Sequence, residues 1–368
     1  MIHYPGDDLA SINAEARVAV ADQHLQLAVI LPVFNNGDLL RERSFASLRR
    51  FPQFSRLHVL LIDDGSTDPD TVATVRELAQ AYPNVTAFLH RTGGSGSASR
   101  PRNVGLALTH TPYVTYLDPD DEAHDDVLWR AHEALAQAPE AQLAITNQLR
   151  AGSEGWQDVN NIRHYDLHPL EGRADLYRAG PQVLTQAQFR QTNLAALVIR
   201  TEWLKSTGIE QVLGAAGQDS LFFLQVFAAA ETFLAHREPA YLYHADTPGS
   251  MVNAVGARYF AKCVIRERAQ AQWLKESSLL EAYVRQGLER ALVTWYLRKL
   301  KQVPGDDGGF QRAECAQLIR EIASLYVGDP SRHRWRYPQT MLFFRRPGLP
   351  SAQGLRAAAA SVRAALSS

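Results

Sequence analysis

The residues best suited to chemistry in this chain are a group of carboxylates in its first half. The apolar run "YVTYL" (113–117) is followed by four acidic side chains within five positions: Asp118, Asp120, Asp121 and Glu122. Such carboxylates repel one another unless a cation or hydrogen-bond donors neutralise them. Mg²⁺ and Mn²⁺ are hard ions that take oxygen ligands, often one or two carboxylates together with substrate phosphates. The same residues also suit an acidic helix start at Pro119, so the pattern alone leaves both interpretations open.

Residues suited to binding a nucleotide follow three other apolar runs in the same part of the chain. Phe34 follows "LAVILPV", and the pair Asp63-Asp64 follows "LHVLLI". The third run leads into "TGGSGSASRPRN", where flexible backbone amides and arginine side chains suit a phosphate. Asp64 would accept a hydrogen bond from a base N–H, and Phe34 would stack on that base. A nucleotide diphosphate with a metal ion therefore accounts for all four positions.

These side chains meet only if a sheet brings the ends of the runs together. The runs "LAVILPVF", "LHVLLIDDGS", "VTAFLH" and "YVTYL" alternate with helical patterns, of which 37–51 and 68–82 are examples. This βαβα order predicts an α/β fold with a mostly parallel sheet and helices on both faces. Ligands of such sheets bind beyond the carboxyl ends of the strands. From about residue 253 the pattern is helical, so we expect a catalytic domain over 1–252 and a helical region over 253–368.

Composition excludes several classes of protein. The chain has 368 residues, of which 46% are hydrophobic, and its 38 basic and 39 acidic residues give a net charge of -1. This balance predicts no general attraction to nucleic acid. The two cysteines, Cys263 and Cys315, form neither a disulfide framework nor a zinc motif. We find no signal-peptide pattern and no apolar run of about 18 residues, so we expect a cytoplasmic location.

The last 38 residues have a different charge. Residues 331–368 contain no Asp or Glu and seven arginines: Arg332, Arg334, Arg336, Arg345, Arg346, Arg356 and Arg363. Clustered arginines are attracted to an anionic membrane surface, which predicts peripheral contact with the inner membrane face. The alternative is that this segment packs on the rest of the protein or stays disordered. The helices before it would pack on the catalytic domain, form a homo-oligomer, or both.

Four motifs in order resemble a known family. "LAVILPVFNN", "VLLIDDGSTD", "RPRNVGLALTHTPYVTYLDPDDE" and "GQDSLFFLQVF" are similar to the motifs of family 2 glycosyltransferases of the GT-A fold. The similarity runs from about Leu27 to Ser250. Within that family, "TGGSGSASRPRNVGL" and "YLYHADTPGSMV" most resemble the bacterial wall teichoic acid glycosyltransferases, which decorate polyol-phosphate polymers.

The resemblance assigns roles to individual residues. Donor binding would involve Pro32, Phe34, Asp64, Gly94, Arg102, Asp118, His244 and Ser250, and Mn²⁺ or Mg²⁺ would be held by Asp118 and Asp120. Asp63 is the less favoured alternative to Asp64 at the uracil. Asp219 would be the catalytic base, although it also suits the N-cap of the helix that begins in "QDSLFF". The residue before it departs from the family, because Gln218 replaces the usual Glu.

The implied reaction is an inverting transfer of a sugar from a UDP-sugar to a hydroxyl group. The acceptor would be a polysaccharide, a teichoic acid-like polymer or a lipid-linked precursor. A nucleotidyltransferase is less favoured, because "PVFNNGD" has no glycine-rich basic loop after the first strand. A non-catalytic nucleotide-sugar-binding scaffold is less favoured because Asp120 and Asp219 are both present. A dinucleotide-binding enzyme is disfavoured because no G-x-G-x-x-G follows the first strand.

Overall fold

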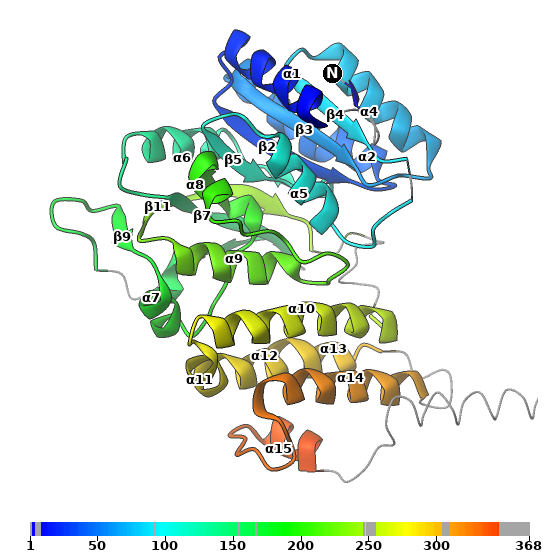
Figure 1. Ribbon diagram of the computed structural model, residues 1–368, viewed down its shortest axis with the longest axis vertical. Coiled ribbons are helices and arrows are strands. Elements are labelled where there is room, and N and C mark those ends of the chain that lie inside the picture. The colour runs from blue at the N-terminus through cyan, green and yellow to red at the C-terminus, as the bar shows by residue number, and fades with distance from the viewer. Residues whose placement is uncertain are drawn as a thin grey trace, which may run out of the picture. The chain divides into compact units, whose positions relative to one another are not determined.

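The described residues of the first two thirds of the chain form one eleven-stranded sheet, whose strands lie between helices (Figure 1). The structure, a computed structural model, describes residues 2–3, 9–91, 93–152, 155–165, 168–245, 247, 255–303 and 310–345. The strands are β1 (Ile2–His3), β2 (Leu27–Val33), β3 (Leu57–Asp63), β4 (Val85–Leu89), β5 (Tyr113–Tyr116), β6 (Glu122–Ala123), β7 (Leu143–Gly152), β8 (Gly155–Val159), β9 (Leu176–Arg178), β10 (Leu197–Arg200) and β11 (Thr232–Tyr243). Their order is β1-β4-β3-β2-β5-β10-β7-β11-β6, with β8 paired to β7 and β9 to β11.

The part of the sheet formed by β1 to β5 is parallel, and the remainder is mixed. β2 pairs in parallel with both β3 and β5, while β10 is antiparallel to β5 and to β7. The chain therefore leaves β2 towards β3 and later returns to its other side at β5. This reversal of strand order opens the crevice in which open α/β sheets bind their ligands.

Helices lie on both sides of the sheet (Figure 1). They are α1 (Leu9–Asp22), α2 (Gly37–Leu39), α3 (Ala46–Arg49), α4 (Pro69–Ala81), α5 (Ser99–Leu108), α6 (Val127–Ala136), α7 (Pro181–Gln186), α8 (Thr201–Ser206) and α9 (Gln218–Ala229). A π-helical segment, Leu40–Phe45, joins α2 to α3. Short 3₁₀ turns occupy Phe54–Arg56, Ile162–His164 and Leu194–Ala196.

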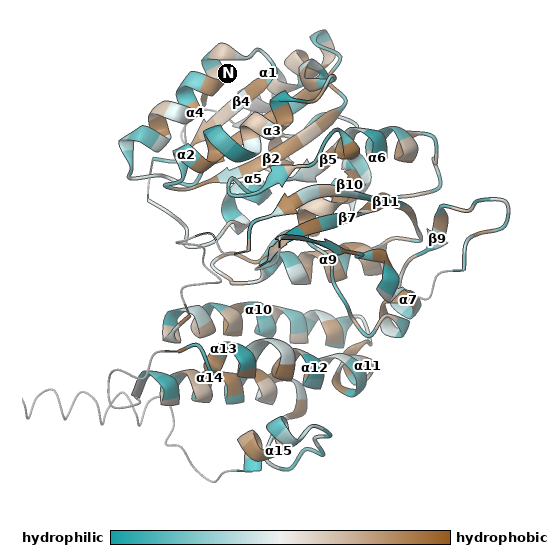
Figure 2. Ribbon diagram, turned by 180° about the vertical axis from the view of Figure 1, so that it is seen from behind, coloured by the Kyte–Doolittle hydropathy of each residue, from teal (hydrophilic) through white to brown (hydrophobic). Residues whose placement is uncertain are grey.

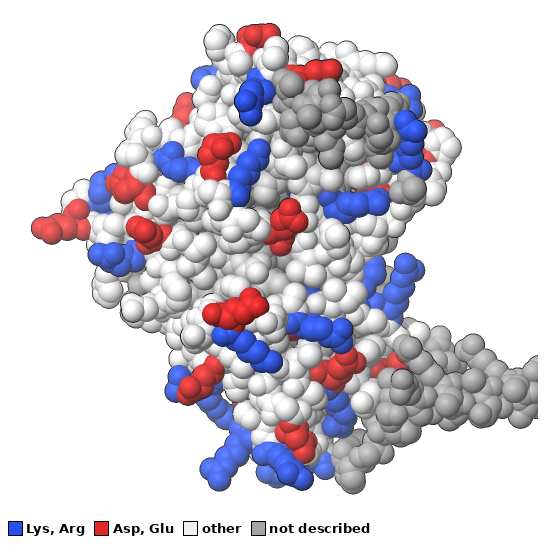
Figure 3. All heavy atoms as spheres, viewed as in Figure 1, with Lys and Arg blue, Asp and Glu red and all other residues white. Residues whose placement is uncertain are grey.

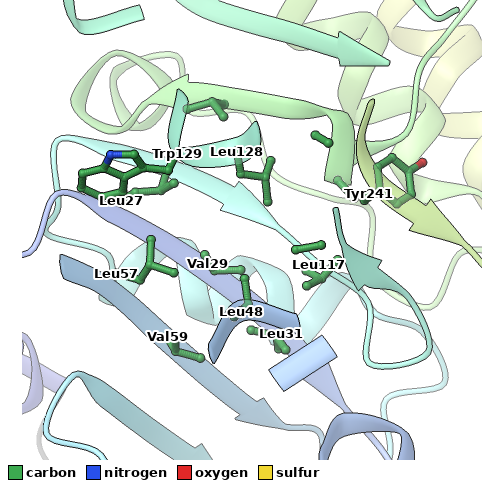
Figure 4. Close-up of a cluster of buried hydrophobic side chains, with 14 of the residues drawn as sticks. Leu27, Val29, Leu31, Leu48, Leu57, Val59, Leu117, Leu128, Trp129 and Tyr241 are labelled. Atoms are coloured by element: carbon green, nitrogen blue, oxygen red, sulfur yellow. The ribbon is translucent and has the colours of Figure 1, made fainter. Parts of the chain in front are cut away.

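Burial on both sides explains the uninterrupted apolar sequence of β2. Alternate residues of the strand, beginning with Leu27, Val29 and Leu31, join a core cluster that also contains Leu48 and Trp129 (Figure 4). The opposite face of β2 lies against α5, where Gly105 allows the helix backbone to approach Ile30. Both faces are therefore removed from water, as expected of a parallel strand between helices. The predicted α/β fold is confirmed.

The chain forms two compact units. The first contains Met1–Gly214 and Gln218–Thr247, and the second contains Ala215–Gly217 and Pro248–Ser368. The second unit is helical, as predicted from the sequence. Its helices are α10 (Ala257–Glu276), α11 (Leu280–Tyr283), α12 (Glu289–Ala291), α13 (Arg298–Leu300), α14 (Phe310–Val327) and α15 (Pro338–Arg345), with π-helical segments at Val284–Leu288 and Leu292–Leu297. These helices carry both polar and apolar residues (Figure 2).

Part of the arginine-rich segment packs within the second unit. Trp335 stacks on Phe344 with ring centroids 4.7 Å apart, and both side chains are buried, whereas Leu342 is 69% exposed. This segment thus packs through Trp335 and Phe344, while Arg346, Arg356 and Arg363 lie outside the described residues. Membrane contact stays a prediction. No helix among the described residues is long and apolar enough to cross a membrane.

Charges are mixed over the surface. On the face shown in Figure 3, the basic and acidic side chains of the described residues are interspersed. This agrees with the near-zero net charge of the sequence. Both cysteines are buried as thiols.

Candidate active site

Three carboxylates converge directly after β5. Asp118, Asp120 and Asp121 each place a carboxylate oxygen within 4.8 Å of the others. Burial, and then the charge of Asp118, raise the pKa of Asp120 to about 6. Burial also raises the pKa of Asp121, and both neighbouring carboxylates add to that effect. Oxygen atoms held this close are a suitable ligand set for a hard divalent ion, whose charge would remove the repulsion.

Basic and amide groups fix the turn that carries these carboxylates. Arg43, from the π-helical segment Leu40–Phe45, donates from Nη1 to the carbonyl oxygen of Asp120 at 3.0 Å. The backbone N–H of His244 donates to Asp121 Oδ1 at 3.0 Å. Arg102 donates from Nη2 to Asp118 Oδ1 at 2.5 Å. The turn is therefore held in place by protein groups on three sides.

Arg102 connects the carboxylate cluster to the predicted catalytic base. Its side chain is 6% exposed, and burial lowers its pKa; the charges of Asp118 and Asp219 and the hydrogen bond to Asp118 act in the opposite direction, and the net shift of the pKa is upward. Asp219 therefore lies within electrostatic reach of the guanidinium that pairs with Asp118. α9 begins at Gln218, which places Asp219 in the first turn rather than at the N-cap. The N-cap interpretation of Asp219 is wrong, because the chain is already helical at this residue.

The predicted base-binding carboxylate anchors the glycine-rich loop. Asp64 is buried, and its Oδ2 accepts hydrogen bonds from the backbone N–H and the hydroxyl of Ser95 at 2.7 and 2.8 Å. Its Oδ1 accepts from Arg100 Nε at 2.6 Å. The neighbouring Asp63 instead accepts from the backbone N–H groups of Gly65 and Ser66. Both carboxylates thus order loops at this sheet edge, and contact of Asp64 with a base stays a prediction.

Phe34 and Gly94 lie against each other at this edge of the sheet. A Cβ added at Gly94 would lie 2.7 Å from Phe34 Cε2, so only glycine fits beside the ring in this arrangement. The ring is 44% exposed and is therefore accessible for stacking. Pro32 is buried within β2, opposite Ile62 of β3, and its contact with a donor stays a prediction.

The two remaining predicted residues follow β11. His244 Nε2 lies 3.1 Å from Glu122 Oε1, and its ring contacts the edge of Trp156. The imidazole of His244 is therefore paired with a carboxylate, while its amide holds Asp121. Contact of His244 with a phosphate stays a prediction. Ser250 lies outside the described residues.

The structure adds three residues that the sequence does not single out as site residues: Asp121, Arg43 and Gln211. Asp121 belongs to the acidic run, and its adjacency to Asp120 is a usable signal. Arg43 reaches the site through a π-helical segment, and such segments occur frequently at functional sites. Gln211 Oε1 accepts from Arg102 Nη1 at 3.4 Å. Neither Arg43 nor Gln211 belongs to a motif with recognisable spacing.

The fold and this carboxylate cluster define an α/β domain suited to a metal-bound nucleotide diphosphate. Comparison with known proteins gives the family. Residues 28–198 match the profile of glycosyl transferase family 2. The chain therefore contains a family 2 glycosyltransferase domain, and the resemblance predicted from its motifs is confirmed.

Two curated relatives act on polyol-phosphate polymers according to their names. The chain is 33% identical over 103 residues to the poly(ribitol-phosphate) beta-N-acetylglucosaminyltransferase TarP of Staphylococcus aureus, covering 28% of this chain and 31% of TarP. It is 24% identical over 172 residues to a poly(ribitol-phosphate) beta-glucosyltransferase of Bacillus spizizenii, covering 46% of this chain and 26% of that protein. The matches thus span about a third or less of these relatives.

A solved structure shows the same fold. The crystal structure of S. aureus TarS 1–349 in complex with UDP-GlcNAc superimposes with a TM-score of 0.61 at 17% identity, covering 82% of each chain. At this identity the similarity establishes the fold only.

Proposed function

We propose that this protein is an inverting, metal-dependent glycosyltransferase that moves a sugar from a UDP-sugar to a hydroxyl of a polyol-phosphate polymer of the teichoic acid type. The observation that supports it best is the pairing of Arg102 with Asp118 while Arg102 also interacts electrostatically with Asp219. This arrangement joins a carboxylate cluster suited to a metal–diphosphate with a carboxylate suited to proton transfer.

Asp118, Asp120 and Asp121 would hold the metal ion, because their oxygens lie within 4.8 Å of one another and their mutual repulsion favours a cation. When bound, Mn²⁺ or Mg²⁺ would neutralise the charge that develops on the departing diphosphate. Arg43 and Arg102 would fix the turn and contribute positive charge beside it.

Asp219 would accept the proton of the acceptor hydroxyl as that oxygen attacks the anomeric carbon. Attack from the face opposite the leaving group in one displacement inverts the anomeric configuration. Phe34 would stack on the uracil, and the loop anchored on Asp64 would surround the nucleotide. His244 would keep Asp121 in place through its amide.

The identity of the donor and acceptor is supported by the relatives. TarS is solved with UDP-GlcNAc, and TarP is named for poly(ribitol-phosphate). A polymer of this type is built from intracellular nucleotide-sugars, so we place the reaction in the cytoplasm. Contact of the arginine-rich tail with the inner membrane face would bring the enzyme to a lipid-linked acceptor.

The test is a UDP-release assay over a panel of UDP-sugars with Mn²⁺ or EDTA. The variants are Asp120→Asn and Asp219→Asn, with Asp125→Asn as the matched control, because the Asp125 side chain is 76% exposed. We expect metal-dependent hydrolysis of one donor, lost in Asp120→Asn and retained in Asp125→Asn. With a polyol-phosphate acceptor present, Asp219→Asn should lose transfer by about 100-fold or more. Failure of the wild type to bind or turn over any UDP-sugar would contradict the proposed function.

A further inference from the structure

One buried polar side chain beside the candidate site has a donor group without a partner in the part of the chain that the structure describes. Gln211 is 3% exposed and lies in the loop between α8 and α9. Its Nε2 makes no hydrogen bond among the described residues. The Nε of the adjacent Arg102, which is also buried, has no partner there either. Among the described residues, one N–H donor group of Gln211 and one of Arg102, which pairs with Asp118, are thus left unsatisfied.

The orientation of the Gln211 amide follows from the chemistry of its neighbour. Arg102 Nη1 can only donate, so the group of Gln211 that faces it at 3.4 Å has to be the carbonyl oxygen. With the amide reversed, two donors would face each other: the NH₂ group of Gln211 and Nη1 of Arg102. The NH₂ group of Gln211 therefore faces away from that contact. Rotating the amide by 180° would not give this group an acceptor, because it would then face the Nη1 donor of Arg102.

The fold holds Gln211 firmly in this position. Asn103 on α5 makes two hydrogen bonds with the Gln211 backbone, each 2.9 Å long: its Oδ1 accepts from the N–H of Gln211, and its Nδ2 donates to the carbonyl oxygen. The hydroxyl of Ser99 donates to the carbonyl of Val212 at 2.6 Å. Three hydrogen bonds thus fasten the loop to α5.

Burying an amide NH₂ without an acceptor is unfavourable, and an apolar side chain at this position would avoid that loss. A firmly held polar side chain with an unsatisfied donor is therefore best explained by an acceptor atom that arrives with a ligand. The neighbours of Gln211 indicate which part of the ligand this is. Arg102 pairs with Asp118 and interacts with Asp219, whereas the base end of the site lies at Phe34 and Asp64.

We propose that Gln211 Nε2 donates a hydrogen bond to an oxygen of the diphosphate–sugar half of the donor, which makes Gln211 a further binding residue. This inference rests on the proposed function, because it takes the ligand to be a nucleotide-sugar. The proposed contact is made to the reacting end of the nucleotide-sugar. The residue that makes it lies in a loop outside the four motifs.

The test uses two substitutions of the full-length protein. Gln211→Glu keeps an oxygen for Arg102 but replaces the donor with an acceptor, and Gln211→Met removes both groups at similar length. Gln186→Glu, at an exposed position in α7, controls for the added charge. Calorimetry would measure the affinities for UMP and for the preferred UDP-sugar at saturating Mn²⁺, and thermal unfolding would confirm that each variant is folded.

We expect both Gln211 variants to bind the UDP-sugar roughly 10-fold or more weakly, with UMP affinity within about twofold of wild type. A purely structural role, supporting Arg102, predicts a different result: Gln211→Glu would bind like wild type and only Gln211→Met would be impaired. That result would overturn the inference, as would a loss of UMP affinity equal to the loss for UDP-sugar. If wild type bound UMP but no UDP-sugar, the proposed function itself would fail, independently of Gln211.

Discussion

Adding one methyl group at Gly94 should displace the ring that is predicted to stack on the donor base. A Cβ built at Gly94 lies 2.7 Å from Phe34 Cε2 and 2.8 Å from Cζ, which is closer than carbon atoms pack. Neither Gly94 nor Gly93 has a positive φ, so alanine is compatible with the backbone at both positions. Gly93 is the matched control, because a Cβ there would meet only the carbonyl oxygen of Gly65 at 4.0 Å.

The expected effect is on binding rather than on folding. The Phe34 ring is 44% exposed and can turn into solvent, so Gly94→Ala should lower the free energy of unfolding by less than about 1 kcal/mol. Stacking of a base on an aromatic side chain contributes about 1–3 kcal/mol. Losing it should weaken UDP binding by about 5-fold to about 150-fold. Gly93→Ala should leave the affinity within about twofold of wild type.

A double-mutant cycle identifies the cause. Calorimetric affinities for UDP would be compared among wild type, Gly94→Ala, Phe34→Ala and the double variant. If the added methyl acts through the ring, Gly94→Ala has no further effect once Phe34 is absent, because the two residues are coupled. Wild-type affinity in Gly94→Ala, or an additive loss in the double variant, would refute the reasoning.

Three further substitutions test the metal site, the core and the response to acid. Asp121→Asn should weaken Mn²⁺ binding by about 10-fold or more, because it removes one of three carboxylates; electron paramagnetic resonance would measure this affinity. Thermal stability without metal should stay equal or rise, because the repulsion among the carboxylates is reduced. Gly105→Ala should destabilise the protein by about 1–3 kcal/mol in urea unfolding, because its Cβ would lie 2.5 Å from Ile30 Cγ2; equal stability would show that α5 shifts freely. Burial lowers the pKa of His58 to about 3, below its value in the unfolded chain, so stability is lost as pH falls below about 6.5. Between about pH 7 and pH 5.5 this costs about 1 kcal/mol, and His58→Gln should reduce the loss by that amount; an unchanged pH dependence would argue against a neutral buried imidazole.

The parallel half of the sheet was predictable because its signals are local. β2 and β3 are continuous apolar runs whose polar residues begin where the strands end, and the chain order alone places those ends at one edge. The mixed half was not predicted strand by strand. β7 and β11 pair although they lie far apart in the sequence, with register shifts between His236 and Leu242, and such pairings depend on long-range interactions that sequence spacing does not encode.

The site shows the same division between local and long-range information. The acidic run drew attention to Asp118 and Asp120 locally, but it also suited a helix start, and the family resemblance favoured the metal interpretation; the structure brings their oxygens together with one of Asp121. Asp219 needed the family resemblance, since an acidic residue at a helix start is common for electrostatic reasons alone. The structure strengthens that assignment through Arg102, which interacts with both Asp118 and Asp219 although Asp219 lies far along the chain.

A neutral donor such as Gln211 is especially hard to recognise from the sequence. A cluster of carboxylates can be recognised in a sequence, because carboxylates that repel one another need a cation or hydrogen-bond donors nearby. A single amide side chain, such as that of the glutamine in "GIEQVLG", needs a partner only once it is buried. Gln211 acquires its importance only when Asn103, 108 positions earlier, fastens its backbone and leaves its NH₂ group without an acceptor among the described residues. Charged residues would thus attract the diphosphate and the metal, while a neutral group such as Gln211 would add a hydrogen bond whose loss is costly, because its buried donor is then left without an acceptor. Substitution of Gln211 is therefore expected to weaken binding of the nucleotide-sugar more than binding of Mn²⁺ alone, whereas substitution of the carboxylates should weaken both.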